Sequence, residues 1–229
     1  MEEKIKWVFK ANKLKEDASQ LSNELNVDII IAEMLVSRGI KTFDQSKSFF
    51  RPNISQLHDP FLMRDMNIAV ERILQAIDQK EKIMVYGDYD VDGISSVALM
   101  SSFLKDMGAI VSTYIPDRSE GYGLSTKGIE EAYEKNQTLI ITLDCGINAI
   151  QQSKFASQKG VDLIICDHHL PCETLPEACA ILNPKRKDCN YPFKELCGCG
   201  IGFKLVQAIN YKNGREIENI LHFLDLVAI

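Results

Sequence analysis

The chain has 229 residues, of which 45% are hydrophobic and 25% charged, and its formal net charge is −6. This composition is typical of a globular protein with one large domain, or one domain and a small accessory piece. No run approaches the roughly 18 apolar residues of a membrane span, and no signal peptide is visible, so we expect a cytoplasmic protein. The negative charge argues against a protein that coats nucleic acid, but not against an enzyme that acts on it.

All seven cysteines lie between Cys145 and Cys199. They include no CxxC pair, and neither a second cysteine pair nor paired histidines follow Cys197 and Cys199 to complete a zinc site. We therefore expect reduced and mostly buried thiols.

Residues 1–80 are predicted to form a small helical region. Apolar residues recur at helical spacing over 17–36, and Gly39 follows as a stop signal. Further helices are expected over 43–50 and 66–76. Because no pattern with catalytic chemistry is visible, we interpret this region as a helical lead-in.

In residues 81–229, short apolar runs alternate with helical stretches. The predicted strands are 83–87, 110–115, 138–143, 162–166 and 178–182, and the predicted helices are 94–107, 126–134 and 148–158. This alternation predicts an α/β fold with a parallel β-sheet of about five strands and right-handed crossovers. Because the strands are apolar throughout, we expect helices to flank both faces.

The segment 87–93 carries three acids at alternate positions, Asp88, Asp90 and Asp92, directly after a predicted strand. Calcium loops of the EF-hand type have a similar spacing. Those loops follow a helix and end in a glutamate, and counting twelve positions from Asp88 leads to Leu99. The three acids therefore indicate a different kind of metal site.

Two further motifs follow predicted strands. Asp144 ends an apolar run, although an aspartate beside a glycine is by itself more often an ordinary turn or helix cap. In the third motif, Asp167 is followed by His168 and His169, and adjacent histidines after a buried strand are a poor choice for packing. A pair of surface histidines is the alternative. Neutral imidazole is a good ligand for manganese, iron or zinc, and imidazolium pairs well with phosphate.

Asp88, Asp144 and Asp167 each stand at or just past the carboxyl end of a predicted strand. Ligands of open parallel sheets bind at that edge, so the three strand ends are expected to bring acids together. Two cations there could generate a nucleophile and neutralise the attacked phosphate and the leaving oxygen. Carboxylates combined with imidazole suit manganese better than calcium.

Five segments occur in the order GDYDVDGISS, IPDRSEGYGLS, LDCGINA, DHHLP and ILNPKR. They resemble the DHH phosphoesterase superfamily and, within it, the RecJ branch of bacterial exonucleases for single-stranded DNA. The resemblance covers nearly the whole chain. It implies a metal-dependent phosphodiesterase that degrades single-stranded DNA from 5′ to 3′ in repair and recombination, with two Mn²⁺ or Mg²⁺ ions.

The resemblance also implies roles for individual residues. The metal ligands that it implies are Asp88, Asp90, Asp92, Asp144 and His168. Asp144 would bridge the two ions and count among the catalytic residues. The other catalytic residues that it implies are His169, which would contact the scissile phosphate, and Asp167, which would ligate a metal or orient a histidine.

Nucleic-acid contacts are expected at four residues. Arg118 could hold a phosphate and Tyr122 could stack on a base, although a glycine-rich turn with a solvated arginine is an equal alternative. Lys185 and Arg186 could follow the DNA backbone or belong to a solvated surface run. A single-strand-binding protein and a helicase are candidate partners.

Three glycines, Gly198, Gly200 and Gly202, begin a predicted apolar helix. Their amides could hold a phosphate at the start of that helix. Close packing of the helix explains the glycines equally well.

In the family, a further metal-binding aspartate follows a segment like LDLVAI, and the present sequence ends there, at Ile229. Asp225 is the nearest acid and stands in the lead-in to that position. The resemblance therefore implies that this chain alone binds one metal weakly and shows little turnover.

Two other functions stay open. One is a DHH phosphodiesterase for short oligonucleotides, cyclic dinucleotides or pyrophosphate, whose first motif begins with a histidine at the position of Tyr86. The other is a non-catalytic nucleic-acid-binding module, which would have lost ligands. Every ligand that the resemblance implies within this chain is present.

Overall fold

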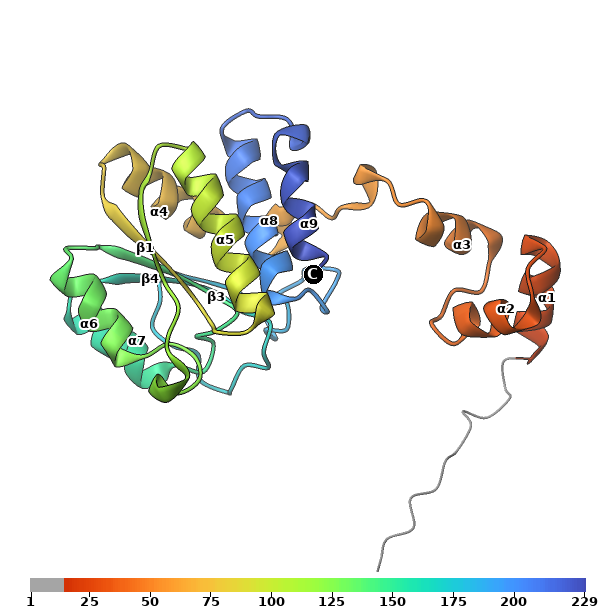
Figure 1. The fold of residues 1–229 in the computed structure, drawn as a ribbon, viewed down its shortest axis with the longest axis horizontal. Helices are drawn as coiled ribbons and strands as arrows, with labels where there is room; N and C mark the ends of the chain where they lie inside the picture. The colour runs from red at the N-terminus through yellow and green to blue at the C-terminus, as the bar shows by residue number, and fades with distance from the viewer. Residues whose placement is uncertain (1–14) are drawn as a thin grey trace, which may run out of the picture. The chain divides into compact units, whose positions relative to one another are not determined.

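The computed structural model describes residues 15–229 (Figure 1), and the chain divides into two compact units between His58 and Asp59. The sequence predicted the boundary between the helical region and the α/β domain at residue 80. The difference includes helix α4 (Met66–Asp78), which belongs to the second unit and has a buried stripe of Met66, Ala69, Val70, Ile73 and Ala76. The apolar face that makes this segment helical also attaches it to the sheet.

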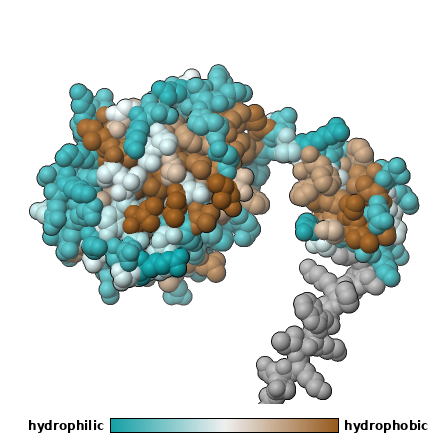
Figure 2. Space-filling view, viewed as in Figure 1, coloured by the Kyte–Doolittle hydropathy of each residue, from teal (hydrophilic) through white to brown (hydrophobic). Residues whose placement is uncertain are grey.

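The first unit contains α1 (Lys15–Leu25), α2 (Ile29–Val36), α3 (Phe43–Phe50) and a 3₁₀ turn (Ile54–Gln56). Helices were predicted here, but the single helix over 17–36 was wrong. Asn26 has a left-handed φ of 52°, and the Asp28 side chain accepts the Ile30 amide at 2.9 Å, which starts a new helix. Figure 2 shows much apolar surface on this unit, to which Ile30, Met34, Phe43, Phe49 and Phe50 contribute.

The second unit is built on a sheet of five parallel strands, as predicted. The strands are β1 (Lys82–Gly87), β2 (Ile110–Tyr114), β3 (Leu139–Leu143), β4 (Asp162–Cys166) and β5 (Ala180–Leu182). Their order across the sheet is β2-β1-β3-β4-β5. Strand β3 is buried at every residue and β1 at all but its first, so the central strands face protein on both sides.

The remaining helices are α5 (Val91–Asp106), α6 (Thr126–Glu134), α7 (Ile150–Gln158), α8 (Gly198–Lys212) and α9 (Leu224–Val227). Short 3₁₀ turns lie at Pro60–Leu62, Arg118–Glu120 and Ile217–Phe223. Helices α4, α5 and α8 cover one face of the sheet, and α6 and α7 cover the other (Figure 1). Across the described residues, no helix combines the length and the apolar character that a membrane crossing requires.

Candidate active site

Three acids lie at the carboxyl edge of the sheet, each after one of three neighbouring strands. Asp88 follows β1, Asp144 follows β3 and Asp167 follows β4. The order of the strands reverses between β1 and β3, and such a switch point opens a crevice at the strand ends. Each of these residues is at most 1% exposed. The strand ends thus bring the three carboxylates together, as the sequence predicted.

The potential ligand atoms at this edge form two groups that share Asp144. One group is Asp88, Asp90 and Asp144, and the other is Asp144, His168 and His169. Within each group, one ligand atom per residue lies within 4.8 Å of the others. A shared carboxylate is what two neighbouring cations require, because the ions of a two-metal site lie only ~4 Å apart.

Several oxygens of these groups are buried without a hydrogen-bond partner among residues 15–229. They are both carboxylate oxygens of Asp88 and Oδ1 of Asp144. His168 Nε2 lies 3.1 Å from Asp144 Oδ1, but the pair does not meet hydrogen-bond geometry. Buried and unpaired carboxylate oxygens are costly. A divalent cation would satisfy them, so the residues present fit a metal.

The electrostatics of the edge also fit a cation. Burial raises the pKa of Asp144 to about 9, and the neighbouring Asp92 adds to the effect. Burial and Asp90 raise the pKa of Asp88 as well. Burial lowers the pKa of His168, which favours the neutral imidazole that metals bind. A cation between these groups would stabilise the ionised carboxylates and so lower their pKa values.

Asp92 is held by the beginning of helix α8. Its two carboxylate oxygens accept the backbone amides of Gly198 and Cys199, each at 2.7 Å. The same carboxylate lies 3.7 Å from His168 Nε2. Gly198 also packs on Asp144, because a Cβ atom there would stand 2.6 Å from the Asp144 Cβ atom. Both amides therefore bind a carboxylate of the site, and Gly198 serves close packing.

His169 is oriented by Asp167. The Nδ1 atom of His169 lies 2.7 Å from Asp167 Oδ1, and the other carboxylate oxygen accepts the Ile147 amide at 2.9 Å. On the opposite side of the ring, Nε2 lies 3.1 Å from the Tyr122 hydroxyl. Of the two roles considered for Asp167, these contacts support the orientation of a histidine.

Residues 82–229 match the family described as DHH family, N-terminal domain. The chain belongs to the DHH family. It is 41% identical over 227 residues to the single-stranded-DNA-specific exonuclease RecJ of Bacillus subtilis (strain 168), which covers 99% of this chain and 28% of the relative. The chain thus spans less than a third of that protein's length.

Two solved structures resemble this DHH chain. The exonuclease RecJ bound to manganese is 31% identical with a TM-score of 0.66, covering 72% of this chain and 42% of the other. RecJ from Thermus thermophilus in complex with Mn²⁺ is 25% identical with a TM-score of 0.73, covering 93% and 29%. The expected fold and the RecJ-like assignment within the DHH family are confirmed.

Tyr89, between the first two acids, connects two of the residues expected to contact nucleic acid. The guanidinium carbon of Arg118 lies 5.1 Å from the centre of the Tyr89 ring. Tyr122 meets the same ring edge-on, with 6.1 Å between ring centres. Arg118 and Tyr122 are exposed. The sequence alone predicts no role for Tyr89, because an aromatic residue between acids gives no sign of which residue it contacts.

The two basic residues after β5 differ in position. Arg186 is 8% exposed, and its guanidinium bonds both carboxylate oxygens of Asp188, Asp65 Oδ2 and a backbone carbonyl. The structure therefore argues against a DNA-contacting role for Arg186, since four of its five N–H donors are bonded within the protein. Lys185 is partly exposed, has its nearest acid, Glu195, 3.7 Å away, and helps to lower the pKa of His168. It remains a candidate for contact with a phosphate.

Asn183 is a residue of the site to which the sequence analysis gave no role. It directly follows β5, is fully buried, and donates from Nδ2 to the His169 carbonyl oxygen at 2.9 Å. Its Oδ1 accepts the Lys185 amide at 2.8 Å. The strand-end argument that identified the acids also applies to this position, and it could have found Asn183.

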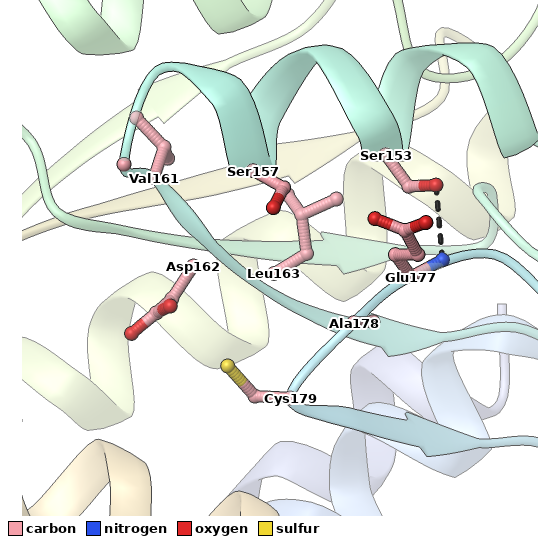
Figure 3. Close-up of a pocket in the computed structure, with 9 residues that line it drawn as sticks. Ser153, Ser157, Val161, Asp162, Leu163, Glu177, Ala178 and Cys179 are labelled. Atoms are coloured by element: carbon pink, nitrogen blue, oxygen red, sulfur yellow. Dashed lines mark hydrogen bonds between the residues drawn. The ribbon is translucent and has the colours of Figure 1, made fainter.

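A separate cavity of about 310 Å³ lies near the start of β4 (Figure 3). Its lining includes Asp162, the first residue of that strand, whereas Asp167 follows the strand's last residue. Figure 3 shows Ser153 of α7 accepting the Glu177 amide, at 3.0 Å. The cavity therefore lies away from the two ligand groups.

Proposed function

We propose that this DHH site binds two Mn²⁺ or Mg²⁺ ions and hydrolyses the terminal phosphodiester bond of single-stranded DNA, from 5′ to 3′. The observation that carries the proposal is Asp144, a buried carboxylate shared by two ligand groups at one edge of the sheet. The similarity to RecJ exonucleases, two of which were solved with manganese, supports the substrate and the metal.

The ligands divide between two ions. Asp88, Asp90 and Asp144 would hold the first, and Asp144 with His168 and Asp92 would hold the second. When bound, the ions supply a nucleophile at neutral pH and neutralise charge on the phosphate and on the leaving oxygen. The amides of helix α8 keep the Asp92 carboxylate in place while it serves an ion.

The remaining residues bind and orient the substrate. His169, as an imidazolium, would donate from Nε2 to an oxygen of the scissile phosphate, because its Nδ1–H is given to Asp167. Arg118 and Lys185 would pair with neighbouring phosphates, and Tyr122 would stack on a base. We also propose that the protein works in the cytoplasm with a single-strand-binding protein and a helicase, which cross-linking in cells would test.

The test combines calorimetric titration with Mn²⁺ and a nuclease assay with the protein in excess over DNA, so that slow cleavage is measured. A long 5′-labelled single strand is compared with its 3′-labelled copy and with a dinucleotide. The proposal predicts Mn²⁺ binding and Mn²⁺-dependent release of the 5′ label, both lost in Asp144→Asn. Cleavage of the dinucleotide alone would favour a DHH phosphodiesterase for short substrates. Binding of DNA without Mn²⁺-dependent cleavage would favour a non-catalytic module.

One contact already argues against the short-substrate alternative. Tyr86 stands where those branches have a histidine, and it is fully buried. Its hydroxyl donates to the Gly123 carbonyl oxygen at 2.9 Å, and its ring stacks on Tyr114. The residue thus holds the loop before α6 and offers no ligand to a metal.

A further inference from the structure

A second cavity, of about 260 Å³, opens beside His169. One wall is the loop from Tyr122 to Leu124, another is the segment 145–149 after β3, and Gln152 reaches it from helix α7. Asp167 and His169 close its remaining side. The cavity therefore adjoins the imidazole that we place against the phosphate.

The walls of this cavity are largely apolar. Leu124, Cys145 and Ile147 line it and are buried. Backbone groups of the lining are already used, since the Gly123 carbonyl accepts the Tyr86 hydroxyl and the Ile147 amide donates to a carboxylate. A pocket with apolar walls and a few polar groups suits a flat and weakly polar ring.

Two side chains give the cavity a preference for a nucleobase. The carboxamide of Gln152 makes no hydrogen bond within residues 15–229, and it can both donate to and accept from the edge of a base. Tyr122 lines the cavity and is 58% exposed, so its ring can stack on a base that enters. An amide that offers both kinds of bond tolerates any base.

We infer that this cavity receives the base of the terminal nucleotide, whose phosphate lies against His169. The inference rests on the proposed function and deepens it. The cavity volume of about 260 Å³ has room for one base. Such a pocket explains how the site would remove one nucleotide at a time from the end of a strand.

The test is an equilibrium titration of the full chain in Mn²⁺ with deoxyadenosine 3′-monophosphate, whose phosphate corresponds to the scissile one, and with deoxyribose 3-phosphate, which lacks the base. Ala149→Leu narrows the cavity, and Gln152→Ala removes the amide. Each is expected to weaken binding of the nucleotide by about tenfold, the scale of one base contact, and to leave the sugar phosphate unchanged. Gln151→Ala is the matched control, because Gln151 is exposed on the same helix and does not line the cavity.

Circular dichroism confirms that each variant is folded before the titrations are compared. Equal weakening of both ligands, unchanged binding of the nucleotide, or a wild-type chain that binds both ligands equally well would each overturn the inference. The titration requires no turnover, so its result is separate from the nuclease assay. Discrimination for the base without strand cleavage would support the assignment of the cavity and count against strand cleavage by this chain.

Discussion

The Nδ1 atom of His169 lies 2.7 Å from Asp167 Oδ1, and the second oxygen of that carboxylate accepts the Ile147 amide at 2.9 Å. Both oxygens of Asp167 are thus engaged by the protein. A carboxylate in this position fixes the imidazole with its Nδ1 proton inward and Nε2 outward. His169 is therefore set in one orientation before substrate arrives.

Asp167→Asn is expected to lower kcat by about a hundredfold or more, because an amide no longer fixes the protonation and orientation of the imidazole. The Mn²⁺ stoichiometry should stay that of the wild type, since we assign Asp167 to the orientation of His169 and not to an ion. Calorimetry and single-turnover cleavage measure the two quantities. Loss of a bound ion in this variant would show that Asp167 is itself a ligand.

The raised pKa of Asp144 predicts that the stability of the metal-free chain falls as pH rises. Its pKa is about 9 in the folded state and ~3.9 when unfolded, so the folded chain binds the extra proton between these values. The free energy of unfolding should decrease across this window, by at most ~1.4 kcal/mol per pH unit. Urea unfolding in a chelator at pH 5, 7 and 8.5 measures the slope.

Asp144→Asn should remove most of that slope and raise the stability at pH 7 by roughly 2–4 kcal/mol, because the amide has no proton to lose. Asp106→Asn, at an exposed acid near the end of α5, is the matched control and should change neither quantity. A slope that survives in Asp144→Asn would place the titrating group elsewhere.

Gly198→Ala is expected to damage the metal site from the neighbouring helix. The added Cβ would meet the Asp144 Cβ atom at 2.6 Å, which forces the two segments apart. We expect a loss of ~1–3 kcal/mol in stability and weaker Mn²⁺ binding. Gly200→Ala is the control, because a Cβ atom added at Gly200 would have the flexible Leu196 side chain as its nearest neighbour, at 3.3 Å. Equal effects of both changes on Mn²⁺ affinity would contradict the packing argument.

Much of the sheet and its acids could be predicted from sequence, for a physical reason. Uniformly apolar runs ending in Asp88, Asp144 and Asp167 identify buried parallel strands, and the ends of such strands meet at one edge. The break between α1 and α2 was not predicted. It depends on the left-handed backbone of Asn26, and asparagine adopts that conformation in only some of its positions.

The role of a charged side chain was harder to predict than its presence. Lys185 and Arg186 are neighbours, and a run of cations does not show which of them faces inward. The answer depends on Asp65, which is 121 positions away in the chain. Sequence spacing carries no information on such a contact, so the ion pair that argues against a DNA contact for Arg186 could not be foreseen, and the expectation for Lys185 stays a prediction.

Arg186→Ala therefore tests a structural role. Arg186 Nη1 lies 2.6 Å from Asp65 Oδ2, and the Arg186 side chain is 7% exposed and that of Asp65 17%. Removal of one partner from such a pair leaves a poorly solvated charge, and we expect a loss of ~3–5 kcal/mol in urea unfolding. Lys187→Ala, at the exposed neighbouring position, should change stability little.

Measurements of DNA binding distinguish the role of Arg186 from that of Lys185. Fluorescence anisotropy with a labelled single strand should give folded Arg186→Ala the wild-type affinity, because four of the five N–H donors of that guanidinium are already bonded within the protein. Lys185→Ala should weaken binding and make it less dependent on salt, as the loss of one phosphate contact requires. If Arg186→Ala instead reduced the salt dependence at unchanged stability, its buried ion pairs would have to open when DNA binds.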